Sequence, residues 1–264
     1  MIGFVMTILI VLISEYYYEK DITLSEIKSF VGFHNARADN LVRYIIFSRE
    51  NSYLDYETVV LYVNIGIDRP FYSHITYVED PYEITVLVNQ FYRQPSYFSP
   101  SDLRRVSSGQ YLREPAREAF LAMRGQMNQL GMDIWLRSSY RNYARQTYLF
   151  NRNVRNHGLY SARRWSAMPG HSEHQLGLAI DITQTNAGGT TLGAANFSRT
   201  RQFEWLLEHA HRFGFILRYP EGYTYITGYN FEPWHWRYVG VYLATYMYEN
   251  NISTLEHYFA MRPN

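Results

Sequence analysis

Two short stretches of the sequence hold side chains that could assemble a metal-dependent active site. One is His171–Asp181, which reads HSEHQLGLAID, and the other is Glu232–His235, which reads EPWH. Two imidazoles and one Asp carboxylate from these stretches would leave a fourth position open on Zn²⁺, as in catalytic rather than structural zinc sites. Glu232 stands three residues before His235, so it could take a proton from water at that open position. The residue types therefore indicate a zinc hydrolase.

Most of the nine histidines offer no partner for a shared metal. His209 and His211 stand two apart on a predicted helix and cannot face the same side of it. His171 is the serious competitor of His174, because one helical turn would bring both rings to one metal. The residues alone leave these two as alternatives.

Composition narrows the class of protein. A chain of 264 residues with 47% apolar residues can build a real core. Its net charge of +1 argues against a nucleic-acid partner, which would need a concentrated basic field. The absence of cysteine excludes thiolate catalysis and Cys-bound zinc, and it fits a bacterial protein that works outside the cytoplasm without disulfides.

The N-terminal part is expected to target or tether the protein. Residues 2–13 are apolar except for Gly3 and Thr7, but they fall short of the roughly 20 residues that span a bilayer. No Lys or Arg precedes them and no A-x-A site follows. We interpret residues 1–14 as a signal- or anchor-like segment of a secreted or membrane-anchored envelope protein, with a buried strand or helix as the alternative. Residues 15–95 carry no chemical motif and are interpreted as an N-terminal extension.

The remaining residues, 96–264, are expected to form the catalytic domain. In them, apolar spacing predicts strands and helices without a βαβ rhythm, which favours an α+β fold with a small, mainly antiparallel sheet flanked by helices. In the predicted strand 178–182, Asp181 points away from the apolar side chains of Ile180 and Ile182. The Gly-rich segment 185–200 is interpreted as an insertion or loop. Helices are predicted over 114–130, 142–156, 202–213, 239–249 and 253–259, and strands over 133–138, 178–182, 215–219, 224–227 and 234–237. Before the domain, 39–47 has helical spacing, 56–67 is a helix or strand, and 86–88 is a plausible strand.

Five blocks of this sequence resemble, in order and spacing, the VanY-type D-alanyl-D-alanine carboxypeptidase family. That family is related to VanX, the bacterial L,D-carboxypeptidases, phage endolysin peptidases and the hedgehog N-domain. The resemblance covers roughly residues 100–260. The blocks are Ser138–Arg141 followed by Gln146, Ser172-x-His174-x-x-Gly177-x-Ala179-x-Asp181, Gly214–Pro220, Thr227–Tyr229 and Glu232–Gly240.

The resemblance implies a hedgehog-like or D-Ala-D-Ala peptidase-like fold and a role for each matching residue. His174, Asp181 and His235 would bind Zn²⁺. Glu232 would be the general base and would later pass a proton to the leaving amine, while Arg141 would hold the scissile carbonyl and stabilise the oxyanion. The residues implied in substrate binding are Ser172 and Gln146, for the terminal D-Ala carboxylate, and Ser139, which replaces a common Gly beside Arg141.

Simpler interpretations stand beside these roles. Arg141 could only pair with a carboxylate, and Gln146 could only decorate a helix surface. Trp234 and Trp236 flank His235 in a predicted strand, so they should point to the opposite face, and one or both should pack beneath the site as core.

The expected activity is removal of the C-terminal D-Ala from peptidoglycan stem peptides or precursors by a zinc-dependent D,D-carboxypeptidase. L,D-cleavage of a tetrapeptide stem is a close rival, since both reactions read a free D-Ala carboxylate. An endopeptidase is a weaker alternative, in which residues 185–200 open one end of the cleft. A non-catalytic zinc-bearing binding module is disfavoured, because Glu232 and Arg141 are both present.

Overall fold

The structure, a computed structural model, describes residues 22–184 and 194–263. Contacts divide the chain into one compact unit of residues 1–69 with 259–264 and a second of residues 70–258. Residues 70–95, which the sequence analysis assigned to the extension, thus belong to the unit that holds the sheet. The functional boundary at residue 96 stays a prediction.

Two expected segments concern parts of the chain that the structure does not describe. The signal-like segment 1–14 lies wholly outside the described residues, as do residues 185–193 of the Gly-rich insertion. Among the helices of the described ranges, none combines the length and hydropathy that a membrane crossing requires.

The first unit is helical. It contains α2 (Leu24–Phe30), the short 3-10 helix η2 (Ala38–Asn40), α3 (Leu41–Glu50) and α4 (Tyr56–Ile65). Thr23 caps α2 by accepting a hydrogen bond from the Glu26 backbone N–H, while the Glu26 carboxylate accepts one from the Thr23 N–H. The helical spacing of 39–47 thus corresponds to α3, and the ambiguous segment 56–67 is a helix. The buried core of this first unit includes Phe30, Tyr44, Ile45, Val59, Val60 and Val63.

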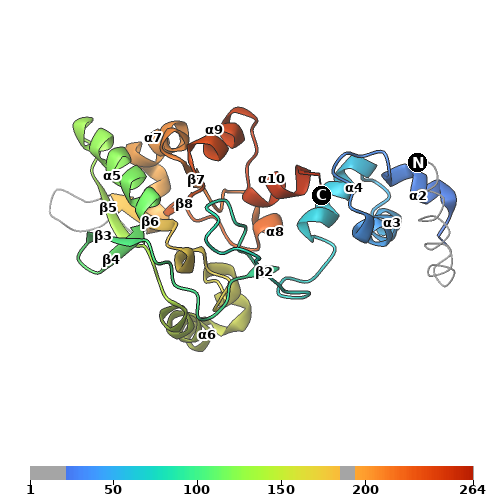
Figure 1. Cartoon of the computed structure of the whole chain (residues 1–264), viewed down its shortest axis with the longest axis horizontal. Coiled ribbons are helices and arrows are strands. Elements are labelled where there is room, and N and C mark those ends of the chain that lie inside the picture. The colour runs from blue at the N-terminus through green and yellow to red at the C-terminus, as the bar shows by residue number, and fades with distance from the viewer. Residues whose placement is uncertain (1–21, 185–193, 264) are drawn as a thin grey trace. The chain divides into compact units, whose positions relative to one another are not determined.

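The second unit is built on a four-stranded antiparallel sheet (Figure 1), which confirms the predicted α+β class. The strand order is β5 (Ile134–Ser138), β6 (Ala179–Gln184), β8 (His235–Tyr238) and β7 (Phe215–Leu217). Two smaller pairs are present: the hairpin β3 (Leu103–Ser107) with β4 (Gln110–Arg113), and the parallel pair β1 (Thr76–Tyr77) with β2 (Tyr92–Arg93). The sequence analysis predicted neither of them.

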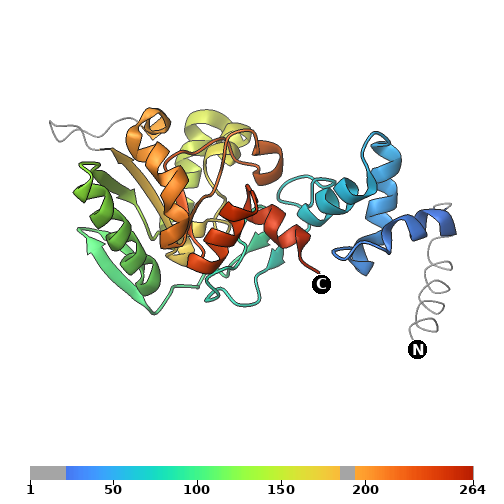
Figure 2. The ribbon, with the colours of Figure 1, turned by 90° about the horizontal axis from the view of Figure 1, so that it is seen from above.

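Helices flank this sheet. In both views, α5 (Glu114–Gln129) and α7 (Arg201–His209) lie on one side of the sheet and α6 (Tyr143–Trp165) lies on the other (Figures 1 and 2). The remaining helical elements are η3 (Glu173–Leu176), η4 (Ala194–Arg199), η5 (Ala210–Phe213), α8 (Thr224–Thr227), α9 (Val241–Glu249) and α10 (Leu255–Met261).

Two strand predictions were wrong. Residues 224–227 form the single turn α8, which ends at Gly228 in the left-handed region (φ 73°), and residues 86–88 are irregular. Short apolar runs do not distinguish a strand from a turn by periodicity alone.

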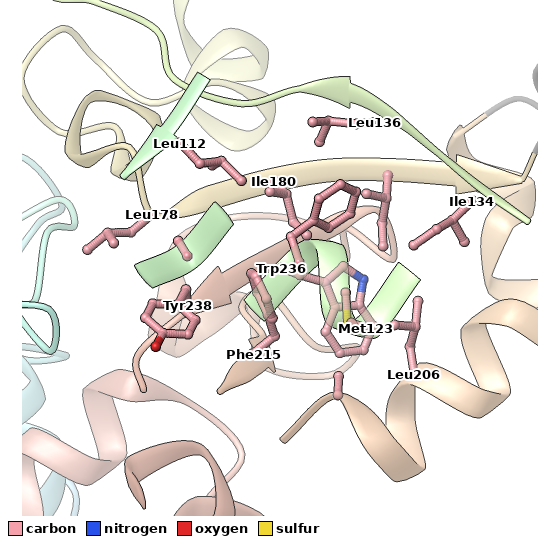
Figure 3. Close-up of a cluster of buried hydrophobic side chains, with 14 of the residues drawn as sticks. Leu112, Met123, Ile134, Leu136, Leu178, Ile180, Leu206, Phe215, Trp236 and Tyr238 are labelled. Carbon is pink, nitrogen blue, oxygen red and sulfur yellow. The ribbon is translucent and has the colours of Figure 1, made fainter. Parts of the chain in front are cut away.

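The hydrophobic core lies on the α5 and α7 side of the sheet (Figure 3). Ile180 and Trp236 point from β6 and β8 into this core, where they lie with Met123 of α5 and Leu206 of α7. Ile182 belongs to the same cluster of buried side chains. Successive side chains of a strand point to opposite faces. The intervening residues of β6 and β8 therefore face the other side, and the candidate site lies there.

Candidate metal centre and active site

Strand register brings Asp181 and His235 together. They are direct partners in the antiparallel pair of β6 and β8, so their side chains lie on the same face. Nδ1 of His235 lies 3.0 Å from Oδ1 of Asp181. Two residues that are distant in sequence thus become neighbours through sheet pairing.

His174 reaches the same place from η3. Its Nδ1 donates a hydrogen bond to the carbonyl oxygen of Ser139 at 2.6 Å, which leaves Nε2 as the unprotonated nitrogen. Nε2 lies 3.3 Å from Oδ2 of Asp181, and the ring meets the His235 ring edge-on with centroids 4.9 Å apart. The Arg141 N–H also donates to the His174 carbonyl at 3.1 Å, so the end of β5 holds η3 in place.

These three residues fit a metal ion. One ligand atom from each of His174, Asp181 and His235 lies within 4.8 Å of the other two. We call these residues the metal cluster. Nε2 of His174 is buried and has no hydrogen-bond partner among the residues that the structure describes, although buried polar atoms are normally satisfied. Two imidazole nitrogens and one carboxylate oxygen are a donor set that zinc accepts while keeping an open position.

The competing ligand, His171, belongs elsewhere. It is buried, and its Nδ1 lies 2.7 Å from the carbonyl oxygen of Asn89. Its ring meets Tyr72 edge-on. It is absent from the metal cluster. The geometry therefore favours His174 over His171 as the first imidazole.

Burial and neighbouring charges set the protonation of the cluster in the metal-free chain. Burial, reinforced by the charge of Arg141, lowers the pKa of His174 to about 4. Burial alone would lower the pKa of His235 too, but the hydrogen bond to Asp181 and the nearby Glu173 carboxylate raise it to about 9. Burial likewise opposes the ionised form of Asp181, whose pKa the two imidazoles nevertheless hold well below its usual range. A cation that binds here must therefore displace a proton from His235.

Glu232 and Arg141 line the same pocket, which has a volume of about 180 Å³. Oε2 of Glu232 lies 3.8 Å from Nδ1 of His235, and the Glu232 N–H donates to the Tyr219 carbonyl at 3.1 Å. Burial raises the pKa of Glu232 to about 8, although the charges of His235 and Arg141 oppose this. Nη1 of Arg141 lies 3.7 Å from Oδ2 of Asp181. A carboxyl group poised near neutral pH and a fixed cation thus flank the metal cluster.

The structure separates the three residues implied in substrate binding. Ser172 lines the pocket, whereas Gln146 and Ser139 do not. Gln146 is buried and donates from Nε2 to the Ala167 carbonyl at 2.7 Å, so it braces the segment after α6. The Ser139 hydroxyl donates to Oε1 of Gln110 at 2.7 Å, and only its carbonyl turns to the metal cluster. Their roles in substrate binding stay predictions.

Aromatic side chains form a wall that the sequence analysis did not identify. Trp165 and Trp234 both line the pocket and stack with ring centroids 6.3 Å apart. The ring of Tyr219 lies 4.9 Å from that of His235. Trp236 packs in the core, as predicted for one or both tryptophans, but the prediction that Trp234 points to the opposite face was wrong, because Trp234 lines the pocket. Trp234 precedes the first residue of β8, so strand alternation does not apply to it.

A group of buried ion pairs adjoins the metal cluster. Oε1 of Glu173 accepts hydrogen bonds from Nε of Arg218 at 2.7 Å and from Nη1 of Arg237 at 2.9 Å. Arg218 also donates to both carboxylate oxygens of Glu256, at 2.7 and 2.8 Å. All four side chains are at most 2% exposed. We call Glu173, Arg218, Arg237 and Glu256 the ionic cluster. The family-like blocks contain three of these residues, but nothing in their spacing predicts the pairing.

Comparison with known proteins places this site in a family. The sequence model described as VanY, D-alanyl-D-alanine carboxypeptidase, matches residues 109–241, half of the chain. The "Putative carboxypeptidase YodJ" of Bacillus subtilis is 37% identical over 191 residues, which are 69% of each chain. The D-alanyl-D-alanine carboxypeptidase of Enterococcus faecalis is 48% identical over 97 residues, which are 37% of this chain and 33% of that protein.

Solved structures agree with the sequence comparisons. The LdcB LD-carboxypeptidase is 34% identical and superposes with a TM-score of 0.65, covering 72% of this chain and 92% of that one. A mutant of the vancomycin-resistance D,D-pentapeptidase VanY, in complex with Zn(II), is 32% identical with a TM-score of 0.59, covering 66% and 98%. Both likenesses extend over nearly the whole of the compared protein.

Proposed function

Since this chain belongs to the VanY family of D-alanyl-D-alanine carboxypeptidases, we propose that it is a zinc-dependent carboxypeptidase. Its substrate would be a peptidoglycan stem peptide or precursor, from which it removes the C-terminal D-Ala. Related proteins support the substrate class: one VanY structure contains D-Ala-D-Ala, and the LdcB structure concerns peptidoglycan recognition.

One observation carries the proposal. The pocket that contains the metal cluster also contains a carboxyl group and a guanidinium in positions to act on a peptide bond. A structural zinc site would need neither, because its ligands complete the coordination. The Zn(II) complex of the related VanY supports the choice of metal.

The residues of this chain divide the chemistry among them. Zinc held by the metal cluster would polarise the scissile carbonyl and lower the pKa of a water molecule. The Glu232 carboxylate would take the proton from the attacking water and then give it to the amine of the departing D-Ala. Arg141, fixed between Asp181 and the end of β5, would stabilise the negative charge that develops on the carbonyl oxygen.

Substrate recognition is proposed for the wall of the pocket. Ser172 would hydrogen-bond the terminal carboxylate of the substrate, because it lines the pocket two residues before His174. Gln146 would act indirectly, by holding Ala167 and the neighbouring pocket wall in position. Trp165 and Trp234 would cover the peptide with apolar surface and exclude water.

A second candidate, L,D-cleavage of a tetrapeptide stem, is favoured by the structural comparison. The TM-score with the LdcB LD-carboxypeptidase, 0.65, exceeds the 0.59 found with the D,D-pentapeptidase VanY. An L,D-carboxypeptidase DacB of Streptococcus pneumoniae is a further neighbour, with 30% identity and a TM-score of 0.54. Both reactions release a free D-Ala, so they share the chemistry and differ in the residue before the cleaved bond.

The test is to incubate purified protein with penta- and tetrapeptide stems and to weigh the products. The same preparation is assayed after removal of metal and after addition of zinc. We expect loss of one D-Ala, no activity without metal and recovery with zinc. Hydrolysis that persists in metal-free protein would contradict the mechanism, and the preferred peptide decides between D,D and L,D cleavage.

His171 provides a matched control for the metal site, because it is a buried histidine three residues from His174 but makes no part of the metal cluster. His174→Gln should abolish zinc binding, whereas His171→Gln should retain it. Equal zinc loss in both variants would contradict the ligand assignment. Action on stem peptides would also place the protein outside the cytoplasm, and we propose that its N-terminal segment directs or tethers it there.

A further inference from the structure

The side chains of the ionic cluster approach those of the metal cluster where Glu173 faces His235. Oε2 of Glu173 lies 3.5 Å from Nε2 of His235. Both atoms are buried, and neither has a hydrogen-bond partner within the described part of the chain. Two orphaned, complementary atoms that face each other at this distance require only a small shift to form a hydrogen bond.

The orientation of the His235 ring determines which of its nitrogens faces Glu173 and which faces the metal cluster. Nδ1 faces Asp181 at 3.0 Å, whereas Nε2, on the other side of the ring, faces Glu173. A neutral imidazole carries one proton, so an acceptor at Nε2 leaves Nδ1 with a free lone pair. That lone pair is directed at the space shared with Asp181 and His174.

We propose that Glu173 is a positioning residue that selects the Nε2–H form of His235 and thereby presents Nδ1 to the metal. This inference rests on the proposed zinc-dependent function. It assigns to Glu173 a part in metal binding, although the carboxylate itself lies outside the metal cluster.

The ionic cluster holds the Glu173 carboxylate so that one of its oxygens remains available to His235. The guanidinium groups of Arg218 and Arg237 both bind Oε1 of Glu173, so Oε2 is left over for His235. Arg218 is in turn held by Glu256, and Arg237 donates to the carbonyl oxygens of Ile84 and Val86. The acceptor is therefore kept ionised and rigid, as outer partners of metal-binding histidines generally are.

His174 has the same arrangement with a different acceptor. Its Nδ1 donates to the backbone carbonyl of Ser139, which leaves Nε2 for the metal. The two histidines thus use opposite nitrogens, each selected by its own acceptor. A backbone carbonyl cannot be removed by substitution, but the Glu173 carboxylate can, and this makes the inference testable.

The experiment compares Glu173→Gln with Glu256→Gln. Both glutamates are buried and bind Arg218, but only Glu173 faces His235. Zinc affinity is measured by competition with a chromophoric chelator. Glu173→Gln should weaken zinc binding by about 10- to 100-fold, as loss of an outer partner typically does. Glu256→Gln should change it less than about threefold, since its carboxylate binds Arg218 and the side-chain amide of Asn89 but does not face His235.

A second measurement needs no substitution. In zinc-loaded wild-type protein with ¹⁵N-labelled histidine, NMR should show a proton on Nε2 of His235 and a metal-shifted Nδ1. A proton on Nδ1 would overturn the proposal even if Glu173→Gln failed to fold. Equal zinc affinities in the two variants, whether lowered or unchanged, would also overturn it, because the ionic cluster would then serve folding alone. Wild-type protein that binds no zinc would instead refute the proposed function.

Discussion

The metal cluster and the ionic cluster are both buried and polar, yet they differ in how completely their atoms are paired. In the ionic cluster, the Arg218 guanidinium meets two carboxylates at 2.7 to 2.8 Å. In the metal cluster, Nε2 of His174 has no hydrogen-bond partner among the described residues. The ionic cluster leaves Oε2 of Glu173 unpaired, and this atom faces His235. Paired charges support the fold around them, whereas an unpaired ring nitrogen is available to a ligand. The comparison assigns chemistry to the metal cluster and structure to the ionic cluster, apart from the Glu173 oxygen that faces His235.

The largest effect is expected for Glu232, which lines the same pocket as the metal cluster but is not one of its ligands. Glu232→Gln keeps the side chain's shape but removes the base, so kcat/KM should fall by roughly 10³- to 10⁴-fold. Zinc affinity should stay within a few-fold of wild type. Peptide hydrolysis followed by mass spectrometry, together with a zinc titration, checks both values. Activity retained in this variant would refute the general-base assignment.

Breaking the ionic cluster should affect folding instead. Arg218→Met leaves Glu173 and Glu256 buried beside one fewer cation, so the free energy of unfolding should fall by roughly 3–5 kcal/mol. Denaturant titration of the zinc-free protein measures this loss. If stability were unchanged while hydrolysis ceased, the division of labour between the two clusters would be wrong.

Substitution of Arg141 should reduce catalysis less than substitution of Glu232. Arg141→Met removes the cation that would stabilise the oxyanion, and kcat should fall by roughly 10²- to 10³-fold. The alternative, in which Arg141 only pairs with Asp181, predicts weaker zinc binding and an unchanged kcat at saturating zinc. Steady-state kinetics at several zinc concentrations separates these two roles.

Sequence reasoning named the residues of the metal cluster but not the pairing in the ionic cluster. Residue type left His171 and His174 as alternatives, the family resemblance implied His174, and the structure brings His174 together with Asp181 and His235. The alternation of β6 correctly turned Asp181 away from Ile180. Charged residues, by contrast, are normally expected at the surface. The burial of Arg218 against Glu173 and Glu256 depends on contacts between segments far apart in the chain.

The fold likewise contains elements that the sequence predicted well and elements that it did not predict. Long periodic segments such as α5 were predicted almost to the residue, because sixteen residues carry several repeats of the apolar pattern. The hairpin of β3 and β4 was missed, since its strands are short, bury only Leu112 and Arg113, and carry little apolar alternation. The predicted direction of Trp234 was wrong for a related reason: Trp234 lies one residue before β8, where strand alternation does not set the direction of a side chain.

The pH dependence of stability should also distinguish the clusters. Glu232 has a folded-state pKa raised to about 8, so its contribution is present at low pH and is lost as pH rises through that value. Between pH 6.5 and 8, zinc-free wild type should lose about 2 kcal/mol more stability than Glu232→Gln. Thermal or denaturant unfolding at several pH values tests this. Parallel curves for the two proteins would mean that burial does not raise the pKa of Glu232.

The smallest effect is expected at Ser139, which separates the backbone contribution of a residue from that of its side chain. Ser139→Ala removes the hydrogen bond to Gln110 and the acceptor of the Tyr111 N–H, at a cost of about 1 kcal/mol in stability. The carbonyl that orients His174 remains, so KM, kcat and zinc affinity should be nearly unchanged. A clear rise in KM would instead support a direct role of the hydroxyl in substrate binding. In that case the active site would include the Ser139 hydroxyl, which donates a hydrogen bond to Gln110 of β4 in the structure.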